Sequence, residues 1–119
     1  MNTRKSESPA GLVQGTLDML ILKTLALEPM HGFGIGQRIE QISRGVFKVN
    51  AGSLFPAFRR LERDGLVRGD WRETENNRRA KYYLLTDAGK KKLKSEARDW
   101  EARTAAIARI LQARPGEVG

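Results

Sequence analysis

The sequence predicts a mainly α-helical fold of the α+β class, in which three helices and a two-stranded hairpin precede one long C-terminal helix. Three observations support this order. Apolar residues recur with helical spacing in three segments between residues 16 and 63. Two strand-like runs then flank a polar turn, and the segment 87–112 repeats its apolar positions every three or four residues. With 119 residues, 39% of them apolar, the chain is large enough for one compact domain.

The first helix is predicted over residues 16–28, after a polar N-terminal tail, residues 1–10, that we expect to be disordered. Thr16 is a suitable N-cap. Apolar side chains occupy most of the helix circumference, which is typical of a helix at the centre of a domain. Pro29 ends the helix because it has no amide hydrogen to donate.

The second helix is predicted within "HGFGIGQRIEQISRG", residues 31–45. Ile35, Ile39 and Ile42 fall on one face of it. The glycines at positions 32, 34 and 36 each weaken a helix by about 1 kcal/mol relative to alanine. Either the helix begins near Ile35, or small residues are needed where another helix crosses closely.

The third helix follows "VFKV", residues 46–49, whose alternating pattern predicts one short strand. Pro56 lacks an amide hydrogen and is best accommodated in a first helical turn. This preference favours Ser53 over Asn50 as the N-cap, and Asn50 remains the alternative because it would place the proline deeper in the helix. Asp64 and the glycine after it end the helix.

The third helix is two-sided. Leu54, Phe58 and Leu61 lie on one side at the helical period, which predicts that this side is buried. Phe55 lies at the boundary between the sides. The opposite side is predicted to face solvent and carries a proline and three arginines, namely Pro56, Arg59, Arg60 and Arg63.

The hairpin is predicted from "LVRGDWRE", residues 66–73, and "AKYYLL", residues 80–85. Asn76 and Asn77 between them suit the positive-φ positions of a turn. Thr86 then caps the fourth helix, with Asp87 in its first turn. Within that helix an apolar seam, spaced 4-3-4-3-4, is typical of a helix packed lengthwise on another: Leu93, Ala97, Trp100, Thr104, Ile107 and Leu111.

Composition narrows the function. The net charge of +8 favours a polyanionic partner. Residues 51–98 hold 13 basic and 7 acidic residues, so most of the excess lies on the third helix, the hairpin and the start of the fourth helix. With no cysteine and one histidine, thiolate and multi-histidine metal sites are excluded, and His31 is expected to make a local turn hydrogen bond. We find no catalytic dyad, nucleotide loop or cofactor motif, no membrane span and no secretion signal, which predicts a cytoplasmic protein that is not an enzyme.

This order of elements is that of a winged helix-turn-helix, in which the third helix enters the major groove and the hairpin, or wing, reaches a neighbouring backbone. We therefore divide the chain into a DNA-binding domain at residues 11–86, a dimerisation helix at residues 87–113 and a C-terminal tail at residues 114–119. We predict that Arg60 and Arg63, from their positions on the outward side of the third helix, and Lys81, on the wing, contact double-stranded DNA. For Arg63 a solvated helix surface is an equally good interpretation.

The chain resembles the PadR-type transcriptional regulators, in particular the short members with a single C-terminal helix. The resemblance covers "GTLDMLILKTLALEPMHGFGIGQRIEQ", "VNAGSLFPAFRRLERDGLVRGDWRE" and "NNRRAKYYLLTDAGKKKL". It implies a dimeric repressor, often released by a small effector, whose fourth helices pair. The DNA contacts that it implies are Ser53, Phe55, Pro56, Arg59, Arg78 and Arg79. The family usually has tyrosine at positions 55 and 33, so a phenolic hydroxyl that could bond a phosphate is missing at Phe55.

The leading prediction is thus a homodimeric, sequence-specific repressor that binds a roughly palindromic operator, with the apolar seam as the dimer interface. Trp100 either forms a wall of a pocket for a small aromatic effector or belongs to the plain dimer core. The alternative function is a ligand-sensing or protein-interaction module that uses the seam and contacts DNA only weakly.

Overall fold

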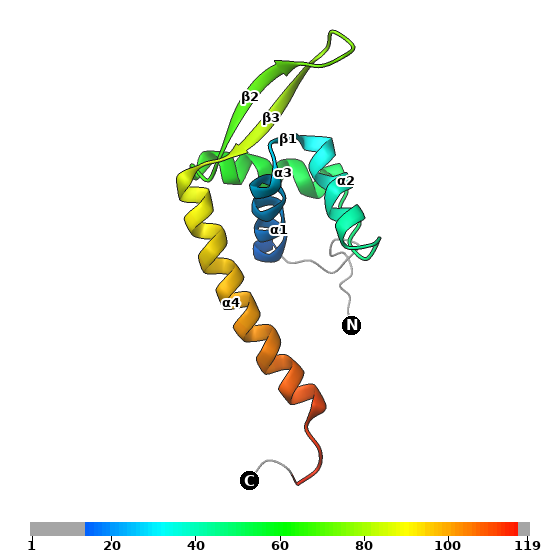
Figure 1. Ribbon diagram of the computed structural model, residues 1–119, viewed down its shortest axis with the longest axis vertical. Coiled ribbons are helices and arrows are strands. Elements are labelled where there is room, and N and C mark those ends of the chain that lie inside the picture. The colour runs from blue at the N-terminus through cyan, green and yellow to red at the C-terminus, as the bar shows by residue number, and fades with distance from the viewer. Residues whose placement is uncertain (1–13, 117–119) are drawn as a thin grey trace.

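The structure, a computed structural model, describes residues 14–116, so the predicted N-terminal tail lies outside the described residues. Figure 1 shows a group of packed helices, a hairpin that extends from them and a long helix that leaves on the other side. The helices are α1 (Gln14–Leu27), α2 (Gly32–Ile42), α3 (Ala51–Arg63) and α4 (Asp87–Gln112), and the hairpin strands are β2 (Val67–Glu73) and β3 (Arg79–Leu85). The predicted winged helix with a long C-terminal helix is confirmed.

A short strand, β1 (Met30–His31), was not predicted and completes a three-stranded antiparallel sheet in the order β1-β3-β2. Met30 pairs with Tyr83, and His31 pairs with Tyr82. The strand predicted at residues 46–49 is wrong, because this segment has no strand partner. Its alternating pattern has another cause: the side chains of residues 47 and 49 pack against the core, while those of residues 46 and 48 are exposed.

The N-termini of α1 and α2 differ from expectation. α1 begins at Gln14, so Thr16 lies inside the helix and is not its N-cap. α2 begins directly after His31, whose Nδ1 accepts a hydrogen bond from the Gly34 amide at 3.1 Å. This bond confirms the expected local role of His31 and places all three glycines inside the helix.

The glycines of α2 allow α3 to approach closely. A Cβ atom on Gly36 would lie 2.8 Å from Leu54 Cδ1, and one on Gly32 would lie 3.0 Å from Phe58 Cε2. Of the two explanations for the glycines, close helix crossing is therefore the one that holds. Ile42, at the end of the same α2 face as two buried isoleucines, is 59% exposed because α2 ends there and nothing in the described residues covers it.

The core lies between α1, α2, α3 and the base of the sheet. Its largest fully buried side chains are Ile21, Leu22, Ile35 and Phe58. The only buried polar side chain among the described residues is Thr24, which donates to the Leu20 carbonyl at 2.7 Å. No helix within residues 14–116 is both long enough and apolar enough to span a bilayer.

The N-cap of α3 is Asn50 and not the favoured Ser53. The Asn50 side chain accepts a hydrogen bond from the Ser53 amide at 3.0 Å, so the helix begins at Ala51 and contains Pro56. Because proline has no amide hydrogen, the Gly52 carbonyl receives no helical bond from position 56. The alternative cap is therefore the observed one, and Pro56 lies in the second turn of the helix.

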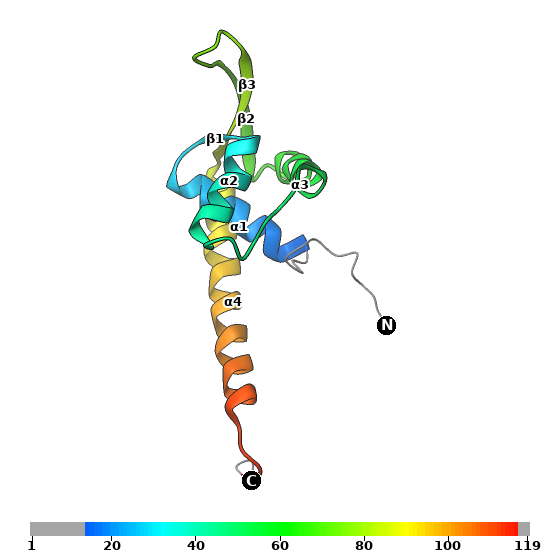
Figure 2. The ribbon, with the colours of Figure 1, turned by 90° about the vertical axis from the view of Figure 1, so that its right-hand side faces the viewer.

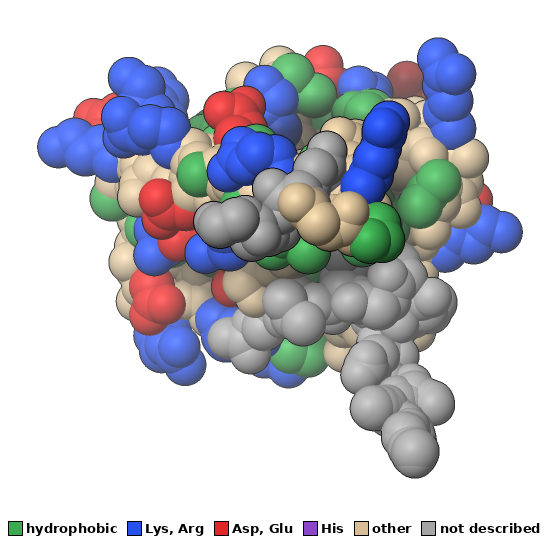
Figure 3. Space-filling model, turned by 90° about the horizontal axis from the view of Figure 1, so that it is seen from below, with side chains coloured by type: hydrophobic (Ala, Val, Ile, Leu, Met, Phe, Trp, Pro, Cys, Tyr) green, Lys and Arg blue, Asp and Glu red, His purple; other side chains and the backbone are tan. Residues whose placement is uncertain are grey.

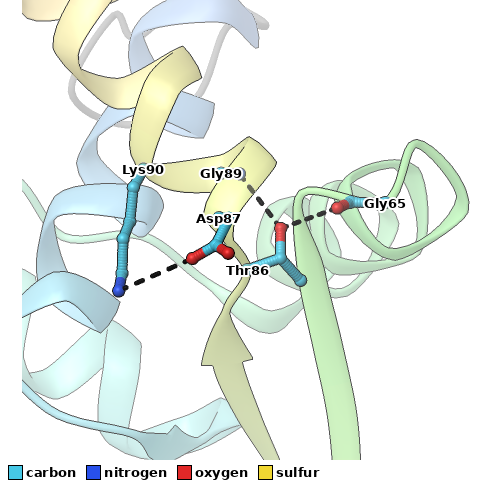
Figure 4. Close-up of polar contacts among 5 residues, drawn as sticks. All are labelled: Gly65, Thr86, Asp87, Gly89 and Lys90. Carbon is cyan, nitrogen blue, oxygen red and sulfur yellow. Dashed lines mark hydrogen bonds and ion pairs between the residues drawn. The ribbon is translucent and has the colours of Figure 1, made fainter.

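The junction between the sheet and α4 is built around Thr86, as predicted (Figure 4). Its Oγ1 accepts from the Gly89 amide at 3.0 Å and donates to the Gly65 carbonyl at 2.7 Å. Asp87 pairs with Lys90 at 3.9 Å in the first turn of the helix. One side chain therefore caps α4 and binds the turn after α3, which ties the directions of the two helices to each other.

Candidate nucleic-acid interface

The outer face of α3 is the centre of the candidate interface. Leu54, Phe58 and Leu61 are 3%, 1% and 2% exposed, which confirms that this side of the helix is buried. Arg59 and Arg63 are exposed on the other side. Arg63 lies 3.3 Å from Asp64, and both side chains are more than half exposed, so this pair holds Arg63 only weakly. Both guanidinium groups are accessible to a phosphate or a base edge.

Arg60 occupies a different place from its two neighbouring arginines. Its Nη2 atom lies 2.8 Å from Asp18 Oδ1 on α1, and the two side chains are 26% and 23% exposed. Burial raises the pKa of Asp18 above its ordinary 3.8, although the Arg60 charge acts in the opposite direction. Arg60 lies near the edge of the outer face, where its long side chain reaches α1. The structure thus places it in an internal ion pair that joins α1 to α3.

The N-terminal end of α3 presents aromatic rings more than free amides. The Ser53 amide is already bonded to Asn50. The Phe55 ring makes edge contacts with Phe33 and Phe58, with ring centroids 5.4 and 5.3 Å apart. Phe33 is exposed, so a row of rings extends from the surface into the core, and Pro56 is half-buried beside it. Phe33 was not among the predicted contacts, and the structure brings it to the same surface.

The wing carries its arginines at the tip. Arg78 and Arg79 are exposed, and the preceding turn has Asn77 at φ +59°, one of the two positive-φ positions expected there. The Arg79 guanidinium lies 5.7 Å from the ring centroid of Trp71, which is 56% exposed. Figure 2 shows that the hairpin extends well beyond the helices. A cationic, partly aromatic tip can reach a backbone or groove that α3 does not touch.

Lys81, the third predicted wing contact, points toward α3. Its Nζ atom lies 2.9 Å from Glu62 Oε1, and this hydrogen bond raises the pKa of Lys81. The structure therefore brings together Arg59, Arg63, Arg78 and Arg79 as exposed cations, whereas Arg60 and Lys81 are engaged by carboxylates.

The charge of the molecule is unevenly distributed along the chain. Residues 51–98 hold 13 basic and 7 acidic residues, whereas residues 99–119 hold three of each. Figure 3 views the molecule from the C-terminal end of α4, where acidic side chains stand among the basic ones. Within residues 14–116 no group of three or more potential ligands could hold a metal ion.

The predicted seam follows α4 away from the core. Leu93, at its start, packs against the core of the same chain. Trp100 and Ile107 are exposed, as is Leu111, which is 79% exposed. Ala97 is half-buried and Thr104 is exposed. The distal half of the seam thus has no cover within the described chain.

An open cavity of about 590 Å³ lies between α1, β3 and the first turns of α4. Apolar side chains and lysines line it, including Leu25, Leu84, Leu93, Lys90 and Lys94. Trp100 is not part of this lining, because it lies two turns further along α4 than Leu93.

Comparison with known proteins gives a consistent result. Residues 21–95 match the model of the "Transcriptional regulator PadR-like family". The structure is similar to that of a transcriptional regulator, Cth-833, from Clostridium thermocellum, with a TM-score of 0.76, 26% identity and coverage of 83% of this chain and 96% of that one. It is also similar to a PadR family transcriptional regulator from Eggerthella lenta, with a TM-score of 0.71, 29% identity and coverage of 85% and 86%.

Among curated sequences, the chain is 40% identical over 79 residues to an uncharacterized 37.1 kDa protein in transposon TN4556 of Streptomyces fradiae. The match covers 66% of this chain and 21% of that protein. An uncharacterized protein X of Lysinibacillus sphaericus is 26% identical over 89 residues, which are 75% of this chain and 82% of that protein.

Proposed function

Because this chain belongs to the PadR-like family of transcriptional regulators, we propose that it is a homodimeric repressor that reads a roughly palindromic operator. In this proposal the outer face of α3 enters the major groove, and the wing tip grips a neighbouring backbone. The two half-sites are spaced by about one helical turn, roughly 34 Å. Such a role would place the protein in the cytoplasm with the DNA.

The division of α3 into a buried face and a cationic face carries this proposal. The buried side fixes the helix in the protein body, so its outer arginines stay in a defined orientation. We assign Arg59, Arg63, Arg78 and Arg79 to phosphate or base-edge contacts. Ser53, Phe55 and Pro56 line the N-terminal end of α3, where the Phe55 ring can contact a sugar or a thymine methyl group. We leave Arg60 and Lys81 outside the interface because Asp18 and Glu62 engage them.

Selection of bound fragments from random DNA with the purified protein will identify the operator and test its palindromic symmetry. Affinity for that operator should fall steeply with salt. Arg59→Ala and the double variant Arg78→Ala/Arg79→Ala should weaken binding, with a smaller salt slope for the double variant. Arg109→Ala, which removes an exposed arginine from the far end of α4, is the matched control. If the double variant bound as tightly as wild type, the wing would have no part in DNA binding.

The exposed distal seam supports the dimer. Apolar side chains on one side of a long helix are costly in water, and a second copy of the same helix would cover them. Ile107→Glu should therefore convert the dimer to a monomer in sedimentation equilibrium. Ala102→Glu adds the same charge to the opposite side of α4 and should leave the dimer intact. Dissociation by both variants, or by neither, would count against pairing through this seam.

The ligand-sensing alternative is supported by the apolar cavity with lysines at its rim. Because Trp100 lies outside the lining of this cavity, its fluorescence in a Trp71→Phe background, where it is the remaining tryptophan, should be quenched only by an aromatic effector that binds further along α4, at the seam. If the same compound also released the protein from its operator, ligand sensing would control DNA binding. A ligand response without any specific footprint at physiological salt would favour the sensing module over the repressor.

A further inference from the structure

The wing is attached to the rest of the protein over a short stretch. β1 pairs with β3 only at Tyr82 and Tyr83. β1 therefore supports the part of the hairpin near the helices and not its outer part. Lys81 is the next β3 residue toward the tip. From there outward, β2 and β3 pair only with each other. An isolated two-stranded hairpin is marginally stable in water, so the outer wing needs another attachment to keep one orientation.

The ion pair between Glu62 and Lys81 supplies that attachment. Lys81 lies on the sheet face of Val67 and Tyr83, whose side chains are buried, and this face is turned toward α3. Its Nζ atom reaches Glu62 Oε1 at 2.9 Å and lies 5.4 Å from the Tyr83 ring centroid. Glu62 belongs to α3, so the pair joins the proposed reading helix directly to the wing.

Gly69 makes this contact sterically possible. It lies on β2 next to the diagonal path of the Lys81 side chain. A Cβ atom at this position would overlap Lys81 Cε and would lie 3.0 Å from Glu62 Oε2. The lysine therefore passes through the space where any other residue would place its side chain.

We propose that Glu62, Gly69 and Lys81 form a positioning unit that fixes the wing relative to α3, and that Lys81 is thereby withheld from DNA phosphates. The part concerning DNA rests on the proposed function. The positioning role follows from the geometry of the free protein and can be tested without DNA.

The first experiment measures amide hydrogen exchange by NMR in the free protein. Glu62→Gln and Lys81→Met should each speed exchange of the wing amides, residues 71–80, by about fivefold, as expected for loss of one charge-assisted bond at a half-exposed site. The charge-swapped variant Glu62→Lys/Lys81→Glu should restore most of the protection. Asp70→Asn, which breaks the exposed Asp70–Arg72 pair on the other sheet face, should have no effect. Unchanged exchange in both single variants would overturn the positioning role.

Gly69→Ala blocks the path of the Lys81 side chain over position 69 and keeps the charges of Glu62 and Lys81. Alanine normally favours a strand more than glycine does. Faster wing exchange in this variant would therefore point to displacement of Lys81, and slower exchange would contradict the proposed passage.

The second experiment measures the dependence of operator affinity on salt. Lys81→Met should leave the salt slope unchanged, whereas Arg78→Ala should lower it by about one. Glu62→Gln frees the lysine and should raise the slope and strengthen binding to unrelated DNA. If Lys81→Met lowered the slope as Arg78→Ala does, Lys81 would be a phosphate contact and the withholding would be overturned. If no variant bound DNA at all, the proposed function would fail, and the exchange experiment would still decide the positioning role.

Discussion

α3 and the distal half of α4 are both two-sided helices, but within residues 14–116 only the apolar side of α3 is covered by other parts of the chain. The apolar side of α3 is almost completely buried against α1, α2 and the sheet. At the other end of the molecule, Ile107, Ile110 and Leu111 are 54%, 72% and 79% exposed. The same kind of apolar pattern is therefore buried in the core in α3 and exposed on the surface in the distal half of α4.

The difference shows what periodicity alone specifies. An apolar stripe with helical spacing predicts that one face of the helix will be buried. It does not indicate which element will cover that face. In α3 the covering elements come from the same chain and leave Arg59 and Arg63 exposed. Figure 1 shows that α4 extends beyond the body of the domain, and in the proposed dimer a second copy would cover its distal face.

Truncation of one apolar side chain on each helix distinguishes the buried face of α3 from the exposed face of α4. Phe58→Ala should lower the free energy of unfolding by about 4 kcal/mol, because it opens a cavity in a side of α3 that is 1% exposed. Leu111→Ala should leave the fold of the single chain unchanged. Any loss of stability in the second variant should depend on protein concentration, since it would come from the partner helix. Chemical denaturation at two protein concentrations measures both free energies of unfolding. A concentration-independent loss for Leu111→Ala would show that the Leu111 side chain is covered within its own chain.

The next prediction concerns the junction between the two regions. Gly89 lies in the first turn of α4, and a Cβ atom there would overlap the Leu66 carbonyl oxygen and lie 2.7 Å from Leu85 Cδ1. Gly89→Ala should therefore cost about 3 kcal/mol, because backbone must move to make room. Gly15→Ala is the matched control: no atom of the described residues lies within 4 Å of its Cβ position and Gly15 is exposed on α1, so alanine should add up to about 1 kcal/mol of stability. A thermal or chemical unfolding series that gave both variants the same sign would contradict the close approach.

A third prediction concerns how α3 is held on its polar edge. Arg60→Met should cost about 2 kcal/mol at pH 7, less than for a fully buried pair, because it leaves the Asp18 carboxylate without its partner. Asp18→Asn should cost less than Arg60→Met, because burial, together with the nearby Asp64 and Glu96 charges, raises the pKa of the Asp18 carboxyl and so already disfavours its ionised form.

The pH dependence of the third prediction has a defined sign. A carboxyl group with a raised pKa in the folded state is penalised while ionised, and the penalty is relieved as the pH falls through that pKa toward the ordinary 3.8. Removing Arg60 raises the pKa of Asp18 further. The free energy of unfolding that Arg60→Met loses should therefore become smaller as the pH falls. Denaturant unfolding measures this loss relative to Asp18→Asn. A loss that grew would show that Asp18 is favoured in its ionised form.

Sequence reasoning succeeded where a pattern repeats over several turns. The buried side of α3, the extent of α4 and its Thr86 cap follow from local spacing and side-chain chemistry. It failed where the signal is too short or the partner too distant. β1 has two residues, too few to show a period, and its place in the sheet depends on β3, some 50 residues later.

The sequence was sufficient to predict which elements form the candidate site, but not which of their basic side chains are free to contact DNA. The exposed positions of Arg59, Arg63, Arg78 and Arg79 follow from helix faces and the turn. The ion pair of Arg60 with Asp18 spans 42 residues and depends on the packing of α1, which no local pattern encodes. The path of Lys81 over Gly69 likewise requires the strand register.

Thr86 lies at the boundary between the two regions, where we expect a smaller loss of stability. Thr86→Val keeps the side-chain shape but removes the hydroxyl that accepts from the Gly89 amide and donates to the Gly65 carbonyl. We expect a loss of about 1 kcal/mol, the usual effect of an N-cap. Thr86→Ser retains both bonds and should recover most of it. Because the two bonds tie α4 to the turn after α3, the valine variant should speed exchange of the Gly89 amide together with that of the turn amides of Gly65 and Leu66. Faster exchange at Gly89 alone would mean that Thr86 only caps the helix, and that the orientation of α4 relative to α3 depends on the close packing of Gly89 against Leu66.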